Sequence, residues 1–162
     1  MSVLTQESAQ KLFAYCPLSG RLVWRPANRR MAGRLAGSIT KGSVRVNCEG
    51  KTYGAHRIIW LLAYGTWPTL SIDHINGNPA DNRLSNLREA THSENVWNSR
   101  RRSSNSSGYK GVSFDKSSGK WQARIMRNYF RVHIGLFDSP QLAYEAYCAA
   151  ANAMHGEFAR VA

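Results

Sequence analysis

The chain has 162 residues, of which 43% are hydrophobic and 20% are charged. Lysine and arginine number 22 against 10 aspartates and glutamates, and the net charge of +12 indicates a polyanionic partner. No stretch approaches the roughly 18 apolar residues that a membrane span requires, so the composition excludes a transmembrane protein.

The first half of the chain predicts a short helix followed by strands. Thr5 is a suitable N-cap for a helix over residues 9–13, with acidic and amide groups in its first turn. Gly20 and Gly50 each stand in a turn sequence between strand-like runs. Residues 56–64 are mostly apolar and predict a buried helix.

Residues 100–107 mark a boundary between two modules. The segment begins with Arg100, Arg101 and Arg102 and continues with serine and asparagine, without any apolar residue. It therefore predicts a solvated linker between a module over residues 1–99 and a module over residues 108–162. Because both modules are basic, we expect the three arginines to contact phosphates; a merely soluble connector is the alternative.

The second module predicts three strands and one helix. Strand-like runs over residues 111–114, 120–126 and 130–136 are separated by turn residues. Ser139 is a suitable N-cap and Pro140 fits the first helical position. Apolar residues then recur at steps of three and four, and we expect that stripe to be core.

The three cysteines and the first residues bear on the compartment. Cys16, Cys48 and Cys148 lie far apart and form no C-x-x-C pair, so we expect buried thiols rather than disulfides or a cysteine-ligated zinc. Residues 1–10 carry neither the basic region nor the apolar run of a secretory signal. We therefore expect an intracellular protein.

The segment over residues 70–98 is unusually rich in aspartate, histidine and asparagine. Many of these residues are turn formers and could simply build a long loop. Asp73 and His74 differ, because they lie in the strand-like run 70–75. An adjacent carboxylate and imidazole could supply a hard oxygen ligand for a cation and a base of near-neutral pKa.

Three blocks in this segment carry a family resemblance. Residues 73–77, 82–88 and 93–95 closely resemble, in order, the HNH endonucleases, and in particular their phage and intron-encoded homing branch. With upstream residues, the resemblance covers roughly residues 10–100. It implies a ββα-metal site, which is a hairpin followed by a helix.

The resemblance also implies roles for four side chains. Asp73 and Asn95 would hold one divalent metal, His74 would activate water, and Asn86 would brace the loop and hold His74 in one tautomer. Asparagine is a weaker ligand than histidine for transition metals, so we expect magnesium, with manganese as the alternative. Asp73 and His74 are neighbours, so the strand must end or twist there for both to reach one phosphate.

Three other polar residues lie near these blocks. We expect His92 to cap the helix or face solvent, and His56 to pack or to contact phosphate. Whether His92 or Asn98 joins the metal site stays open.

The second module has a resemblance of its own. Residues 109–112, 119–121, 134–137 and 143–147 resemble the plant ethylene-response-factor (Apetala-type) DNA-binding domain, over nearly all of residues 108–160. The resemblance implies a three-stranded antiparallel sheet in the major groove with one helix packed behind it.

Alternation along the strands predicts which side chains face that groove. Arg124 and Arg131 are the best candidates to read bases, because a guanidinium matches guanine bidentately. The full set expected to contact DNA is Lys110, Ser113, Lys116, Gln122, Arg124, Arg131 and His133.

We therefore expect an α+β protein with an N-terminal ββα-metal (HNH) module and a C-terminal three-stranded sheet with one packing helix. Its expected function is metal-dependent, site-directed cleavage of double-stranded DNA, by a monomer without membrane contact, in the cytoplasm of a bacterial or phage-infected cell. Deleting residues 103–162 should then weaken targeting and spare basal cleavage. The alternatives are a non-catalytic DNA-binding regulator with a vestigial HNH motif and a structural RNA-binding protein, which leaves the Asp-His pair unexplained.

Overall fold

A computed structural model describes residues 4–101, 103–127 and 130–161, so Arg102 lies outside the described residues. Contacts divide the chain into two compact units, Met1–Ala90 and Thr91–Ala162. Both combine short antiparallel sheets with helices, which confirms the predicted α+β class.

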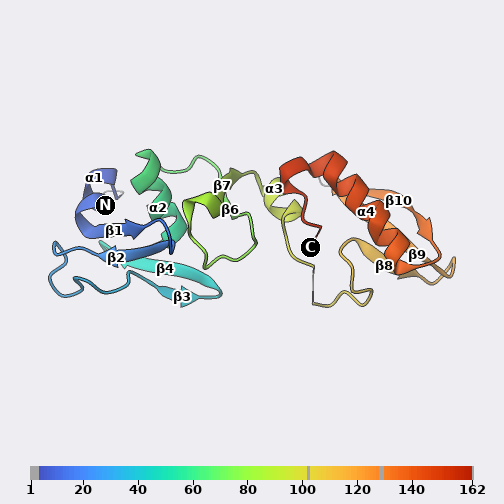
Figure 1. The fold of residues 1–162 in the computed structure, drawn as a ribbon, viewed down its shortest axis with the longest axis horizontal. Helices are drawn as coiled ribbons and strands as arrows, with labels where there is room; N and C mark the ends of the chain where they lie inside the picture. Colours follow the sequence, from blue (N-terminus) through green and yellow to red (C-terminus); the bar gives the residue numbers. More distant parts are fainter. Residues whose placement is uncertain (1–3, 102, 128–129, 162) are drawn as a thin grey trace. The chain divides into compact units, whose positions relative to one another are not determined.

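The first unit combines hairpins and a three-stranded sheet with two helices among its described residues (Figure 1). Strand β1 pairs with β2, β4 lies between β3 and β5, and β6 pairs with β7, all antiparallel. In chain order the elements are α1 (Gln6–Leu12), β1 (Phe13–Cys16), β2 (Arg21–Trp24), β3 (Ser38–Thr40), β4 (Ser43–Cys48), β5 (Lys51–Gly54), α2 (Ala55–Tyr64), β6 (Ser71–His74), the 3-10 turn η1 (Leu84–Asn86) and β7 (Leu87–Ala90).

Thr5 caps α1 as predicted, and its hydroxyl accepts a hydrogen bond from the backbone N–H of Ser8. The helix ends at Leu12 rather than residue 13, because Phe13 is already extended and begins β1. No sequence pattern predicted β3, since the strand has only three residues, all exposed, and only one of them, Ile39, is apolar.

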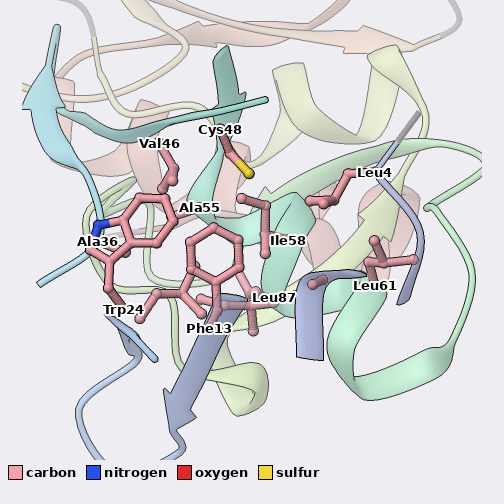
Figure 2. Close-up of a cluster of buried hydrophobic side chains, with 13 residues drawn as sticks. Leu4, Phe13, Trp24, Ala36, Val46, Cys48, Ala55, Ile58, Leu61 and Leu87 are labelled. Carbon is pink, nitrogen blue, oxygen red and sulfur yellow. The ribbon is translucent and has the colours of Figure 1, made fainter. Parts of the chain in front are cut away.

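One apolar core holds the first unit together (Figure 2). The rings of Phe13 and Trp24, which come from the paired strands β1 and β2, lie 4.5 Å apart between centroids. Ile58 and Leu61 of α2 are buried in the same cluster. Leu87 of β7 also belongs to it, so the β6–β7 hairpin is anchored in this core.

The three cysteines are free, as expected. Cys48 is buried, but Cys16 is exposed, which corrects the expectation of a buried thiol. The reason is local: Cys16 is the last residue of β1, where the chain leaves the core for a turn. Among the described residues, no helix is long and apolar enough to cross a membrane.

The second unit contains a short helix, a three-stranded antiparallel sheet in the order β10-β9-β8, and a long helix (Figure 1). Val112, Ala123 and Ile125 of the sheet are buried with Ala143 and Tyr147 of the long helix, so that helix covers one face. The elements are α3 (His92–Trp97), β8 (Val112–Asp115), β9 (Lys120–Arg127), β10 (Phe130–Phe137), α4 (Pro140–His155) and η2 (Gly156–Phe158).

Helix α3 belongs to the second unit by its contacts, although we expected residues 1–99 to form one module. The indole of Trp97 stacks on the imidazole of His155, with centroids 4.2 Å apart and an interplanar angle of 5°. The ammonium of Lys110 also donates to the carbonyl oxygen of Trp97 at 2.5 Å. These contacts explain why α3 packs with the C-terminal unit.

The expected linker is partly structured. The Asn105 side chain donates to the carbonyl oxygen of Tyr109 at 2.8 Å. The Ser107 hydroxyl donates to the carbonyl oxygen of Val112 at 2.8 Å. The end of the linker is therefore hydrogen-bonded to the start of the sheet.

Candidate active site

The β6–β7 hairpin positions Asp73 and His74 at the end of a strand. In the antiparallel register Asp73 lies opposite Arg88 and His74 lies opposite Leu87. Both polar residues are buried, with 6% and 8% of their surface exposed. Strand β6 ends at His74, where the N–H of Gly77 donates to the His74 carbonyl oxygen and turns the chain.

Asp73 is held by a cross-strand ion pair. The Nε of Arg88 donates to Oδ2 of Asp73 at 3.0 Å, and both side chains are largely buried. Arg88 lies in one of the three motif blocks, but its place in the sequence predicted no role for it. The hairpin register was the signal that could have found the pair, because residues directly opposite in a sheet share one face.

His74 is held by Asn82. Oδ1 of Asn82 lies 3.0 Å from Nε2 of His74, and Asn82 is only 2% exposed. With Nδ2 of Asn82 directed toward the carbonyl oxygen of Ala80, its Oδ1 can only accept, so Nε2 of His74 carries a proton. Nδ1 is then the basic atom of the neutral ring.

Asn86 braces the loop between the two strands. Its Oδ1 accepts from the backbone N–H of Asn76 at 2.9 Å, and its Nδ2 donates to the carbonyl oxygen of Asp81 at 2.7 Å. We expected Asn86 to hold the tautomer of His74 as well. The side chain hydrogen-bonded to His74 is that of Asn82, whereas Asn86 bonds backbone groups of the loop.

A second group of contacts stiffens this loop. Asp81 accepts two hydrogen bonds from the guanidinium of Arg83, at 2.8 and 2.6 Å. Arg83 is the main cause that lowers the pKa of Asp81 to about 2. The Nδ2 of Asn76 also donates to the Asp81 carboxylate, at 2.8 Å. The loop therefore has a fixed shape when it presents Asn82.

His56, the second residue of α2, lies against His74 as a packing partner. The two ring centroids are 5.3 Å apart in an edge-to-face arrangement. Burial is the first cause that lowers the pKa of His56 to about 4, followed by the nearby His74, Arg45 and Arg57. Its Nδ1 is buried and makes no hydrogen bond among the described residues.

Asn95 lies on α3, in the second unit, and is half-buried. The helix begins with a capping box in which Thr91 and Glu94 exchange hydrogen bonds, so its first turn is well defined. His92 is exposed, whereas Asn98 is buried at the end of the helix. A metal-ligand role for Asn95 stays a prediction.

The donor chemistry fits a hard cation. Asp73 offers a carboxylate and Asn95 an amide oxygen, which are the kinds of ligand that magnesium takes while it keeps several waters. Among residues 4–101, 103–127 and 130–161, no three His, Cys, Asp or Glu side chains lie together in a way that could hold a metal.

The exposed face of the β8–β10 sheet carries most of the side chains expected to contact DNA. Arg124 lies opposite His133, and both are exposed. Gln122 lies opposite Ser113 on the same face, and its Nε2 is 3.3 Å from Nδ1 of His133. Four more of the residues expected to contact DNA are exposed: Arg131, Lys116, Arg100 and Arg101.

Lys110 has a different position from the one we expected. Its ammonium bonds the carbonyl oxygen of Trp97 instead of extending from the rim of the sheet. Burial, followed by the nearby charge of Arg160, lowers the pKa of Lys110 to about 8. This lysine therefore contributes to the packing of α3.

Comparisons with known proteins agree with these features. The family model described as HNH endonuclease matches residues 53–97, and the AP2 domain model matches residues 107–157. Protein 3.8 of Escherichia phage T7 is 35% identical over 106 residues, which cover 65% of this chain and 87% of that protein. No solved structure matches the chain.

An HNH endonuclease of Acanthamoeba polyphaga mimivirus, itself uncharacterized, is 32% identical over 106 residues. The match covers 64% of this chain and 54% of that protein, so the chain spans about half of its length. Fold, site and matches together define the class: an HNH nuclease-type domain followed by an AP2-type DNA-binding domain. The chain belongs to the HNH endonuclease family and is a relative of phage protein 3.8.

Proposed function

We propose that this protein is a homing-type, metal-dependent endonuclease that hydrolyses phosphodiester bonds in double-stranded DNA. The observation that carries the proposal is the state of His74. Its Nε2 is hydrogen-bonded to Asn82, so the basic atom of the neutral ring is Nδ1. HNH and AP2 family matches support the choice of DNA as the substrate.

In this proposal His74 accepts a proton from the water that attacks the scissile phosphorus. Asp73 and Asn95 hold one divalent cation, for which magnesium is the first choice and manganese the second. When bound, such an ion offsets charge on the phosphate and the leaving 3′ oxygen. Asn86 keeps the loop in shape and touches no reacting atom.

The C-terminal unit would supply targeting. The sheet face would enter the major groove, where Arg124 and Arg131 read bases and neighbouring side chains contact phosphates. The arginine triplet would contact phosphates between the modules; its member Arg102 lies outside the described residues. We propose that the protein acts as a monomer in the cytoplasm of a bacterial or phage-infected cell.

One observation favours a second candidate, a DNA-binding regulator without catalysis. Arg88 already donates to Oδ2 of Asp73, so a cation at that oxygen would have to share it with a guanidinium. A site that had lost its metal could keep this ion pair as a structural contact. The two candidates differ in one property, which is cleavage.

Cleavage of supercoiled plasmid with magnesium, and its loss with a chelator, tests the proposal. We expect His74→Ala to lower the cleavage rate by about 10²-fold with nearly unchanged DNA affinity, as the loss of a general base implies. Lys11→Ala is the control, because Lys11 is exposed on α1 and lies outside the motif blocks. Inert wild-type protein with intact DNA binding, across magnesium and manganese, would favour the regulator.

A further inference from the structure

We propose that the N-terminal β1–β2 hairpin positions the general base, and that Tyr15 and Gly20 are its two positioning residues, acting through Asn82. The inference rests on the proposed role of His74. Neither residue is part of the HNH motif blocks, and both lie more than fifty residues before Asn82.

Gly20 brings the hairpin turn into direct contact with the backbone of the HNH loop. A Cβ atom at Gly20 would lie 2.5 Å from the backbone nitrogen of Arg83 and 2.7 Å from the carbonyl carbon of Asn82. Both neighbours are backbone atoms, so a side chain at position 20 can be accommodated only if the loop moves. Gly20 also has a φ of +70°, which favours glycine by itself.

Tyr15 bonds the same stretch from the adjacent strand. Its hydroxyl accepts a hydrogen bond from the backbone N–H of Leu84 at 3.0 Å and donates to the carbonyl oxygen of Asn82 at 3.4 Å. Burial raises the pKa of Tyr15, so the phenol keeps the proton that it donates. One side chain therefore bonds both sides of Arg83.

These contacts end at the base itself. The backbone of Asn82 is fixed by Tyr15 and Gly20, and its buried side chain accepts from Nε2 of His74 at 3.0 Å. Because a hydrogen bond weakens steeply with distance and angle, a shift of the loop weakens the contact with Asn82 that favours a proton on Nε2 of His74. The hairpin thereby selects the tautomer whose Nδ1 can act as the base.

Two glycine substitutions distinguish the positioning role of Gly20 from the backbone strain that any alanine at a positive φ causes. Gly20→Ala and Gly50→Ala place alanine at nearly equal φ values, +70° and +73°. Nothing lies within 4 Å of a Cβ at Gly50, in the β4–β5 turn, so that variant carries the same kind of backbone strain without pushing on the loop. Thermal unfolding of both variants checks that they fold.

The first measurement is the ¹⁵N NMR spectrum of the histidine rings at alkaline pH, with His74 assigned among the five histidines by His74→Ala. We expect wild type and Gly50→Ala to show the Nε2–H tautomer, and Gly20→Ala to show a mixture. The second is plasmid cleavage at saturating DNA, where Gly20→Ala should be about tenfold slower than Gly50→Ala at equal DNA affinity. Equal tautomers and equal rates in the two variants would overturn the proposal.

If Gly20→Ala does not fold, Tyr15→Phe tests whether the β1–β2 hairpin positions His74. It removes only the hydroxyl, and we expect a smaller shift of the tautomer in the same direction with a rate loss of about threefold. An unchanged His74 spectrum in Tyr15→Phe would then overturn the proposal. If the wild-type protein does not cleave, the proposed function fails, while the NMR comparison still tests the positioning by the hairpin.

Discussion

Burial lowers the pKa of His56 to about 4 from the ordinary histidine value of 6.5. Between these two pH values the unfolded chain binds a proton that the folded protein does not bind. The free energy of unfolding therefore falls as the pH drops from 6.5 toward 4, and it carries no penalty from this group above that range. The difference between the two pKa values corresponds to about 3 kcal/mol as an upper limit.

His56→Gln removes this titration, so the variant should lose less stability in acid than wild type. We expect the difference in unfolding free energy between pH 7 and pH 4.5 to be smaller in the variant by about 2 kcal/mol. Urea unfolding at the two pH values measures it. An equal acid loss in both proteins would show that His56 is solvated and free to titrate normally.

Some residues of the site could be predicted from the sequence, and others could not, for a physical reason. Asp73, His74 and Asn86 could be identified from their spacing in a motif. Asn82 looked like a turn former, because its hydrogen bond to His74 exists only after the loop has closed. The ion pair between Asp73 and Arg88 depends on the register of β6 and β7. That register could not be predicted without knowing the length of the turn that joins the two strands.

Helix α3 has only six residues, too few to be stable without tertiary packing. Its packing comes from the stack of Trp97 on His155 and from Lys110. His155 is in turn fixed by a hydrogen-bond contact of its Nε2 with the carbonyl oxygen of Met126 at 2.8 Å. The helix that carries Asn95 therefore depends on the C-terminal unit.

His155→Ala should loosen α3, whereas His155→Phe keeps an aromatic ring against Trp97. An aromatic pair contributes about 1 kcal/mol beyond burial, so we expect amide hydrogens of residues 92–97 to exchange about fivefold faster in the alanine variant. The phenylalanine variant should exchange at a rate closer to wild type. Hydrogen exchange that is equal in all three proteins would exclude the stack as the source of order in α3.

Helices and strands could be predicted where a capping residue or a regular spacing of apolar residues indicated them. Helix α4 is an example: the side chain of its N-cap Ser139 accepts a hydrogen bond from the N–H of Leu142. The contacts divide the chain at a different place from the expected linker. Residues 100–107 have the composition of a linker, but the contacts separate the units between Ala90 and Thr91. Composition reports solvent preference, whereas α3 contacts the second unit through a stack between Trp97 and His155, which are far apart in sequence. The expected boundary at residues 100–107 stays a prediction.

The position of α3 changes the outcome expected for deletion of residues 103–162. From the sequence, truncation should have weakened targeting and spared basal cleavage. Because the deletion removes His155 and Lys110, α3 loses its packing, and we now expect cleavage to be lost together with targeting. The first unit has its own core and should still unfold cooperatively, which thermal denaturation checks. A truncated protein that cleaves plasmid at the wild-type rate would contradict this.

The net charge of +12 favours binding to DNA of any sequence. A test of targeting therefore has to distinguish sequence-specific affinity from this electrostatic affinity. Arg124→Ala and Arg131→Ala each remove one positive charge from the sheet face, and Lys11→Ala removes one from the exposed Glu7 ion pair on α1. If the arginines read bases, each loss costs about 1–3 kcal/mol at the DNA sequence that wild type enriches from a random pool. Lys11→Ala should bind that sequence like wild type, and all three should bind random DNA almost equally. Equal weakening by Lys11→Ala and Arg124→Ala would mean that the C-terminal sheet adds charge and no sequence recognition.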